Sequence, residues 1–242
     1  MSIINTILKK EIDSYFKNYM IYIIVGIYLL LSFAATFYAA YFFEYDNRGL
    51  LSFFAYQPEI FNVLLPTLTM KMWAEEHKQG TLEFLLTQPV SRGALVLGKY
   101  LSSFLTGVFL LFLTLPFLIY SSFLIDLDWL NIISGYFACL LVVGTLCALG
   151  CLISAYNTNP ILAYLASVFV GWIWQNVNFD ILLTPFKVCF PLLQNRLSAF
   201  LNFTSHYQSL VQGQISLVSI GYFISLILMF LWLNLYLVQR RR

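Results

Sequence analysis

Long stretches without a charged residue constrain this chain more than any other feature of its sequence. The stretch from Tyr19 to Phe43 contains no charged residue, and a helix needs only about 20 apolar residues to cross the hydrocarbon core of a bilayer. No water is present in that core, so the chain must satisfy its own backbone N–H and C=O groups, which an α-helix does. The sequence therefore predicts an all-α integral membrane protein.

The composition excludes several classes of soluble protein. Of 242 residues, 60% are hydrophobic and 10% are charged, and the mean hydropathy is +0.80. Soluble domains are about half apolar and about a quarter charged, so the charges are too few to cover a cytoplasmic globular enzyme. The same balance excludes a disordered chain and a nucleic-acid-binding protein.

Six stretches are long and apolar enough to cross a membrane, and they predict a single transmembrane domain over residues 1–242. The six stretches cover residues 19–43, 52–73, 94–123, 132–153, 160–177 and 216–238. An even number of spans places both termini on one side. Of the 13 lysines and arginines, only Arg48, Lys187 and Arg196 then fall on the opposite side. Because cytoplasmic segments carry the excess of basic residues, both termini are predicted to be cytoplasmic.

Residues 1–18 are predicted to form an amphipathic helix before the first span. Apolar residues recur there at spacings of three and four, whereas Lys9, Lys10, Asp13 and Lys17 fall between them. Such a helix lies in the inner interface of the membrane, with its lysines toward anionic lipid headgroups. The alternative is a solvated leader that contacts no lipid.

No pattern in the sequence is typical of a catalytic, cofactor-binding or metal-binding site. His77 and His206 are predicted on opposite sides of the membrane and cannot share a metal. The four cysteines form no C-x-x-C pair, and we interpret them as small packing residues between helices. They are Cys139, Cys147, Cys151 and Cys189.

Two residues in the predicted spans need a separate interpretation. Gly93–Tyr100 has the glycine and lysine spacing of a phosphate-binding P-loop, but Tyr100 replaces the hydroxyl residue and no strand precedes the segment. Lys99 is therefore predicted to reach the inner headgroups. Glu59 is either a functional intramembrane acid or part of the outer start of the second span, and the adjacent Pro58 favours the start.

The cytoplasmic segment 74–93 carries the most specific pattern in the chain. Gly80 is predicted to end the helix that continues from the second span, and Thr81 to cap a short new helix that Pro89 stops. Leu82, Leu85 and Leu86 share one face of that helix. Two helical turns cannot bury an apolar face unaided, so this face requires a groove in the chain itself, in the lipid interface or in a soluble partner.

The external segment 178–213 is too apolar for a free loop. Non-helical backbone at membrane depth must be buried in protein, so the segment is predicted either to dip into the outer leaflet as two short helices or to form a cap outside it.

The inner loop resembles that of ABC transporter permeases of the type-2 (ABC-2) exporter class. Residues 75–91, EEHKQGTLEFLLTQPVS, match the pattern E-x-x-x-G-T-L-E-x-L-L-T-x-P-V-S of that class from Glu76 onward. Residues 96–101, VLGKYL, and residues 205–215, SHYQSLVQGQI, are similar as well. The resemblance covers essentially the whole chain and is greatest to the F permease subunit of the gliding-motility-type transporter.

This resemblance implies an architecture and a set of partners. The implied fold has six transmembrane helices, an amphipathic N-terminal elbow helix, a cytoplasmic coupling helix and external re-entrant helices between spans 5 and 6. The implied partners are a separate ABC ATPase subunit and a second permease copy or related membrane subunit, in the bacterial inner membrane. The ATPase-contacting residues that the resemblance implies are Glu75, Glu76, Gly80, Thr81, Leu82, Glu83, Leu85 and Leu86.

Two functions are therefore open at the level of sequence. One is a permease subunit that couples ATP hydrolysis by its partner to export or extraction of a substrate, and that hydrolyses no ATP itself. The other is a non-transporting membrane scaffold that docks a soluble protein through residues 74–93.

Overall fold

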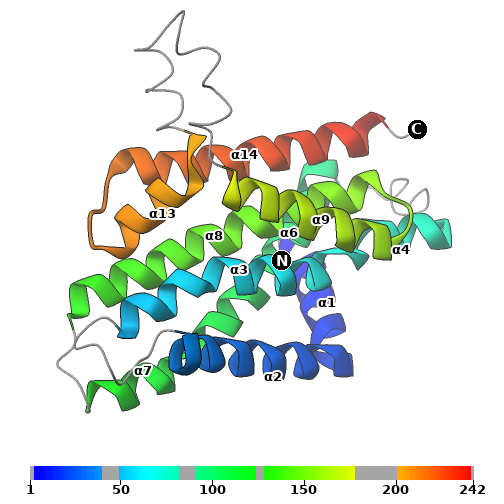
Figure 1. The fold of residues 1–242 in the computed structure, drawn as a ribbon. Helices are drawn as coiled ribbons and strands as arrows, with labels where there is room; N and C mark the ends of the chain where they lie inside the picture. Colours follow the sequence, from blue (N-terminus) through cyan, green and yellow to red (C-terminus); the bar gives the residue numbers. More distant parts are fainter. Residues whose placement is uncertain (1–2, 40–48, 82–90, 124–127, 178–200, 241–242) are drawn as a thin grey trace, which may run out of the picture.

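The computed structural model describes residues 3–39, 49–81, 91–123, 128–177 and 201–240, and every regular element in these ranges is helical (Figure 1). The helices are α1 (Ile3–Lys17), α2 (Tyr19–Ala34) with a π-helical end η1 (Ala35–Ala39), α3 (Gly49–Thr69), α4 (Lys71–Gln79), α6 (Arg92–Phe112), α7 (Leu115–Ser122), α8 (Trp129–Tyr156), α9 (Pro160–Asn176), α13 (Phe203–Val211) and α14 (Leu217–Arg240). The all-α prediction is confirmed for the described residues.

Helix α8 lies at the centre of the bundle. It packs against α3, α4, α6, α9, α13 and α14. In its most apolar stretch of 18 residues, 78% of the residues are buried. Cys139, Cys147 and Cys151 are buried on this helix as free thiols, which confirms their interpretation as packing residues. Cys189 lies outside the described residues.

Four of the described helices are long and apolar enough to cross a membrane. They are Tyr19–Phe37, Arg92–Ser122, Trp129–Tyr156 and Leu217–Arg240, which correspond to the predicted first, third, fourth and sixth spans. The predicted fifth span is helix α9, which has 17 residues. The predicted second span is helix α3, in which Gln57, Glu59 and Asn62 lower the hydropathy.

Two predicted spans are interrupted where the sequence contains prolines or polar residues. The third consists of α6 and α7, with Pro116 in the first turn of α7, because a proline has no N–H for the preceding turn. The second ends at Thr69, and α4 begins at Lys71 with Met70 between them. The predicted range 52–73 therefore includes the start of a separate helix.

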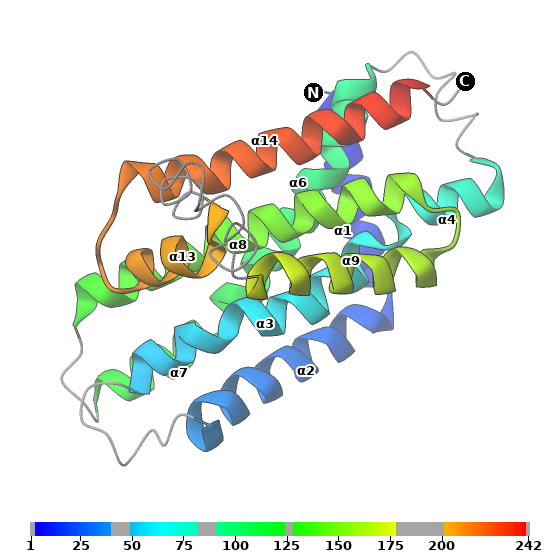
Figure 2. The ribbon, with the colours of Figure 1, turned by 45° about the horizontal axis from the view of Figure 1, so that its top comes forward.

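Helix α1 runs across the other helices rather than along them (Figure 2). It crosses α6 at Gly98, where an added Cβ would lie 2.8 Å from Ile7 Cγ2. The absence of a side chain at Gly98 thus permits the close approach of the two helices.

We expect Gly98→Ala to lower the stability of the protein by about 1–3 kcal/mol, because an overpacked contact forces its neighbours to shift. The matched control is Gly93→Ala on the same helix, where an added Cβ meets nothing within 4 Å; it should cause no loss, since alanine favours a helix over glycine. Thermal unfolding of the purified variants in detergent measures both. Equal midpoints for the two variants would contradict the packing of α1 on α6.

Candidate functional site: the cytoplasmic segment and its anchor

Helix α4 contains the start of the segment 74–93, which is predicted to be cytoplasmic, and it ends where the sequence predicts. Gly80 follows it with φ = 69°, a left-handed conformation that glycine adopts without strain. The hydroxyl of Thr81 donates to the Glu76 carbonyl at 3.4 Å, which also accepts from the backbone N–H of Gly80, so two donors satisfy this carbonyl at the end of α4.

The predicted ATPase-contacting residues divide into two groups. Glu75, Glu76, Gly80 and Thr81 lie on α4 or directly after it. Leu82, Glu83, Leu85 and Leu86 lie outside the described residues, so the predicted leucine-faced helix stays a prediction.

The first turn of α4 is held by a side chain from the central helix. Ser154 of α8 accepts hydrogen bonds from the backbone N–H groups of Trp73 (3.1 Å) and Ala74 (3.2 Å). The same hydroxyl donates to the Met70 carbonyl at 3.0 Å. No side chain of α4 itself caps this end, so Ser154 satisfies N–H groups that would otherwise lack partners. Nothing in the local sequence of α4 indicates this serine.

Lys99 of α6 links α4 to both α6 and α1. Its Nζ lies 2.7 Å from Glu76 Oε1 and 3.3 Å from Glu11 Oε1 on α1. The ammonium also donates to the Met72 carbonyl at 2.6 Å and lies 4.9 Å from the centre of the Trp73 ring. Lys99, Glu11 and Glu76, which we call the lysine node, therefore join three helices at one buried point.

The position of Lys99 corrects the prediction that it reaches the headgroups. Its side chain is only 3% exposed, because two carboxylates and a carbonyl satisfy the ammonium inside the protein. Residues 93–100 lie within helix α6, whereas a P-loop follows a strand and turns its backbone N–H groups toward phosphate. The geometry thus contradicts a phosphate-binding interpretation of this segment.

The carboxyl group of Glu76 responds to two opposing effects. Burial raises its pKa from the ordinary value of 4.5, while the Lys99 ammonium lowers it and the nearby Glu11 raises it again. Burial has the largest effect and outweighs the lysine, so the pKa of Glu76 is raised and this carboxyl binds a proton more readily than an exposed glutamate does. Its second oxygen, Oε2, has no hydrogen-bond partner among the described residues.

Helix α1 is fixed to the same region by two further contacts. The Tyr15 hydroxyl donates to the Leu68 carbonyl at the end of α3, at 2.9 Å. Phe16 meets Phe109 of α6 edge to face, with ring centroids 5.5 Å apart. Helix α1 thus contacts both α3 and α6, and Lys99 joins it to α4 through Glu11 and Glu76.

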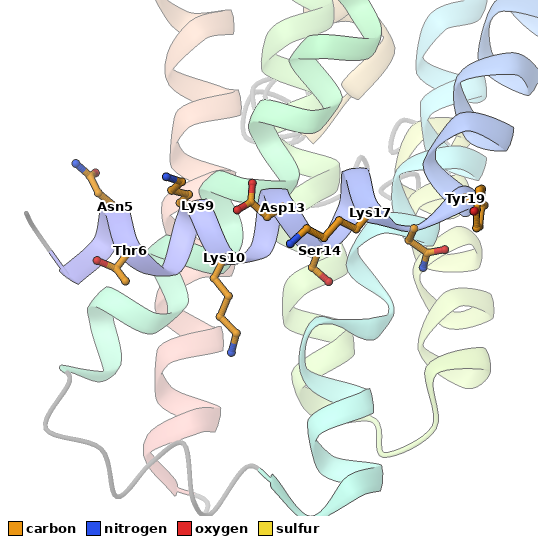
Figure 3. A pocket seen from close by; sticks show the side chains of 9 residues that line it. Asn5, Thr6, Lys9, Lys10, Asp13, Ser14, Lys17 and Tyr19 are labelled. Carbon is orange, nitrogen blue, oxygen red and sulfur yellow. The ribbon is translucent and has the colours of Figure 1, made fainter.

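The opposite face of α1 is polar and open. Figure 3 shows Lys9, Lys10, Asp13 and Lys17 along a shallow depression of about 950 Å³, with Lys10 pointing toward the side on which α4 ends. The amphipathic pattern predicted for residues 1–18 therefore describes the helix that forms, Ile3–Lys17.

Glu59 does not lie at the start of its helix. Helix α3 begins at Gly49, so Pro58 and Glu59 lie inside this helix, and the prediction that they mark the outer start of the second span stays a prediction. The helix continues through Pro58 because side chains of other helices donate to the carbonyls near the proline. The Tyr207 hydroxyl, for example, donates to the Phe54 carbonyl.

Within the described residues, no three metal-ligating side chains lie together.

Comparison with known proteins agrees with this architecture. The family model described as "ABC-2 family transporter protein" matches residues 5–239. A search of curated proteins finds no significant match.

Proposed function

Because the chain belongs to the family of ABC-2 transporter proteins, we propose that it is the transmembrane permease subunit of an ABC-2-type transporter. In this role it couples ATP hydrolysis by a separate ATPase subunit to the export of a substrate, or to its extraction from the membrane. The observation that carries the proposal is the lysine node, which connects the cytoplasmic helix α4 to α1 and α6 through buried charges.

The proposed path of coupling begins at the segment 74–93. An ATPase that binds there moves α4, and α4 cannot move alone because Ser154 and Lys99 attach it to α8 and α6. Glu75, Gly80 and Thr81 are proposed to contact the ATPase together with the leucine face that follows. Glu76 binds Lys99 through Oε1, and with a side chain that is 21% exposed it is proposed to lie at the edge of the ATPase-contacting surface.

The proposed assembly contains a second membrane subunit, either another copy or a related permease. Apolar side chains on α9 are exposed in the single chain, among them Leu165, Phe169 and Trp172, and lipid or such a subunit would cover them. We further propose that α3 and α9 are the second and fifth of six spans, and that α13 belongs to an external re-entrant segment. Within the ABC-2 family, the protein is proposed to resemble the F permease subunit of the gliding-motility-type transporter.

The proposed orientation places both termini in the cytoplasm of a bacterial cell, with the protein in its inner membrane. Introduced cysteines test it in a background without other cysteines. A cysteine at the exposed Lys78 should react with a membrane-impermeant maleimide only after the cells are opened, whereas one at Arg196 should react in intact cells. Labelling of residue 78 in intact cells would reverse the topology.

The alternative, a scaffold that only docks a soluble protein, predicts the same binding surface but no motion. Spin labels on the exposed residues Leu30 of α2 and Trp172 of α9 report the distance between these helices. In a permease, ATP with vanadate should shift that distance relative to the nucleotide-free complex. An unchanged distance in a complex that hydrolyses ATP would favour the scaffold.

A further inference from the structure

A polar pocket of about 380 Å³ lies among α3, α9 and α13, away from the cytoplasmic segment. Its volume is within the usual range for small-molecule sites, about 300–1,000 Å³. Helix α9 ends at this pocket with Gln175 and Asn176, and α13 begins at it with Phe203 and Thr204. Figures 1 and 2 show α13 beyond the end of α9, so the pocket lies between the end of α9 and the start of α13.

Hydrogen bonds between helices fix the walls of this pocket. Pro58 has no N–H, so the Phe54 carbonyl one turn earlier lacks its helical partner. The hydroxyl of Tyr207 from α13 donates to that carbonyl at 2.6 Å. Gln175 of α9 donates through Nε2 to the Pro58 carbonyl at 3.1 Å. These bonds join all three helices, so the pocket is formed before any ligand enters.

The charge of the pocket comes from Glu59. Its side chain is exposed on the pocket wall, and the ion pairs of the described residues do not include it. The two helix ends carry partial charges of about half an elementary charge and of opposite sign, negative for α9 and positive for α13. They offset each other, so the carboxylate makes the pocket acidic.

The pocket also contains a free acceptor. Gln175 is 6% exposed, and its Oε1 accepts no hydrogen bond from the described residues. A buried acceptor without a donor destabilises a protein, so a ligand that brings a donor to it recovers that loss. The Gln175 acceptor and the Glu59 carboxylate together favour a positively charged ligand that donates hydrogen bonds.

We propose that this pocket binds the protonated amine of an amphiphile, with the ammonium group between Glu59 and Gln175. Val63 of α3 and Trp172 of α9 expose apolar surface on the same two helices, which suits an alkyl chain that lies along the protein. A charge at membrane depth normally faces a cavity or a partner group, and the ligand supplies that partner. The claim that the amine is the transported substrate deepens the proposed permease function and rests on it. The claim that the pocket binds the amine does not depend on that function.

Calorimetric titration of the full chain in phosphatidylcholine nanodiscs at pH 7 tests the proposal, with octylammonium as the probe and octanol as its neutral counterpart. Octylammonium should bind the wild type at least ten times more tightly than it binds Glu59→Gln. Gln175→Leu should weaken binding about three- to tenfold, because it removes a neutral acceptor. Octanol should bind the wild type and Glu59→Gln equally.

The control variant is Asp13→Asn, which removes an exposed carboxylate from α1 and should leave the affinity unchanged. Thermal unfolding without ligand verifies that each variant is folded; if Glu59→Gln is not, Glu59→Asp keeps the charge and should bind within about threefold of the wild type. Equal affinity of wild type and Glu59→Gln, or an equal loss in Asp13→Asn, overturns the proposal. The titration contains no ATPase and therefore tests the bound ligand alone. A protein that binds the amine but accompanies no ATPase when it is purified from its native membranes would refute the permease function and leave the amine site standing.

Discussion

Leu85→Asp should weaken the complex between this protein and the proposed ATPase subunit by an order of magnitude or more. Burial of each leucine of the face formed by Leu82, Leu85 and Leu86 contributes about 1.5–3 kcal/mol by hydrophobic transfer. Only part of this free energy appears as affinity, since docking also orders side chains and removes rotational freedom. An aspartate at the centre of that contact is desolvated without a partner and opposes binding further.

Two measurements on the same preparations distinguish docking from folding. Pull-down reports the ATPase that remains bound, and membrane extraction reports insertion, which Leu85→Asp should not affect because residue 85 lies outside the predicted spans. The matched variant Glu83→Gln should be mild, since a helix-end charge contributes about 1 kcal/mol or less. Wild-type ATPase levels with Leu85→Asp would show that the leucine face is not the docking surface. Loss of the variant from the membrane would show that the loop supports the fold of the chain itself.

Lys99→Met should lower the stability of the protein by about 3–5 kcal/mol. The change removes the cation of the lysine node and leaves the carboxylates of Glu11 and Glu76, each 21% exposed, without an ion-pair partner. Loss of one member of a buried ion pair is costly for this reason. The control is Lys78→Met on the exposed surface of α4, which should change the stability by about 0.5 kcal/mol or less.

A double variant separates the charge effect from packing. Lys99→Met with Glu76→Gln removes one of the two stranded carboxylates, so it should recover part of the lost stability, and the difference from the sum of the single effects measures their coupling. Thermal unfolding in detergent gives the midpoints. If Lys99→Met unfolds at the wild-type midpoint, the node does not hold the three helices together.

The apolar helices could be predicted from the sequence because composition alone determines them. Helix α8 was expected over residues 132–153 and forms over Trp129–Tyr156; α14 was expected over 216–238 and forms over Leu217–Arg240. A run of apolar residues in a bilayer has one stable backbone conformation, so its approximate limits follow from length and hydropathy.

The partners of polar residues could not be predicted in the same way. Lys99 binds glutamates 23 and 88 positions away in sequence, and no local periodicity connects residues so distant. Without these two partners in view, the sequence predicts that Lys99 reaches the headgroups. The continuation of α3 through Pro58 and Glu59 could not be predicted locally either, because hydrogen bonds from the distant helices α9 and α13 stabilise it.

The most direct test of the central claim is purification of the tagged full-length protein from its native membranes, followed by identification of the soluble subunit that accompanies it. We expect an ABC-type ATPase that hydrolyses ATP in the complex and is lost when Leu85→Asp is purified in the same way. Intact wild-type protein that carries no nucleotide-hydrolysing subunit, or that carries a soluble partner without ATPase activity, would contradict the permease function.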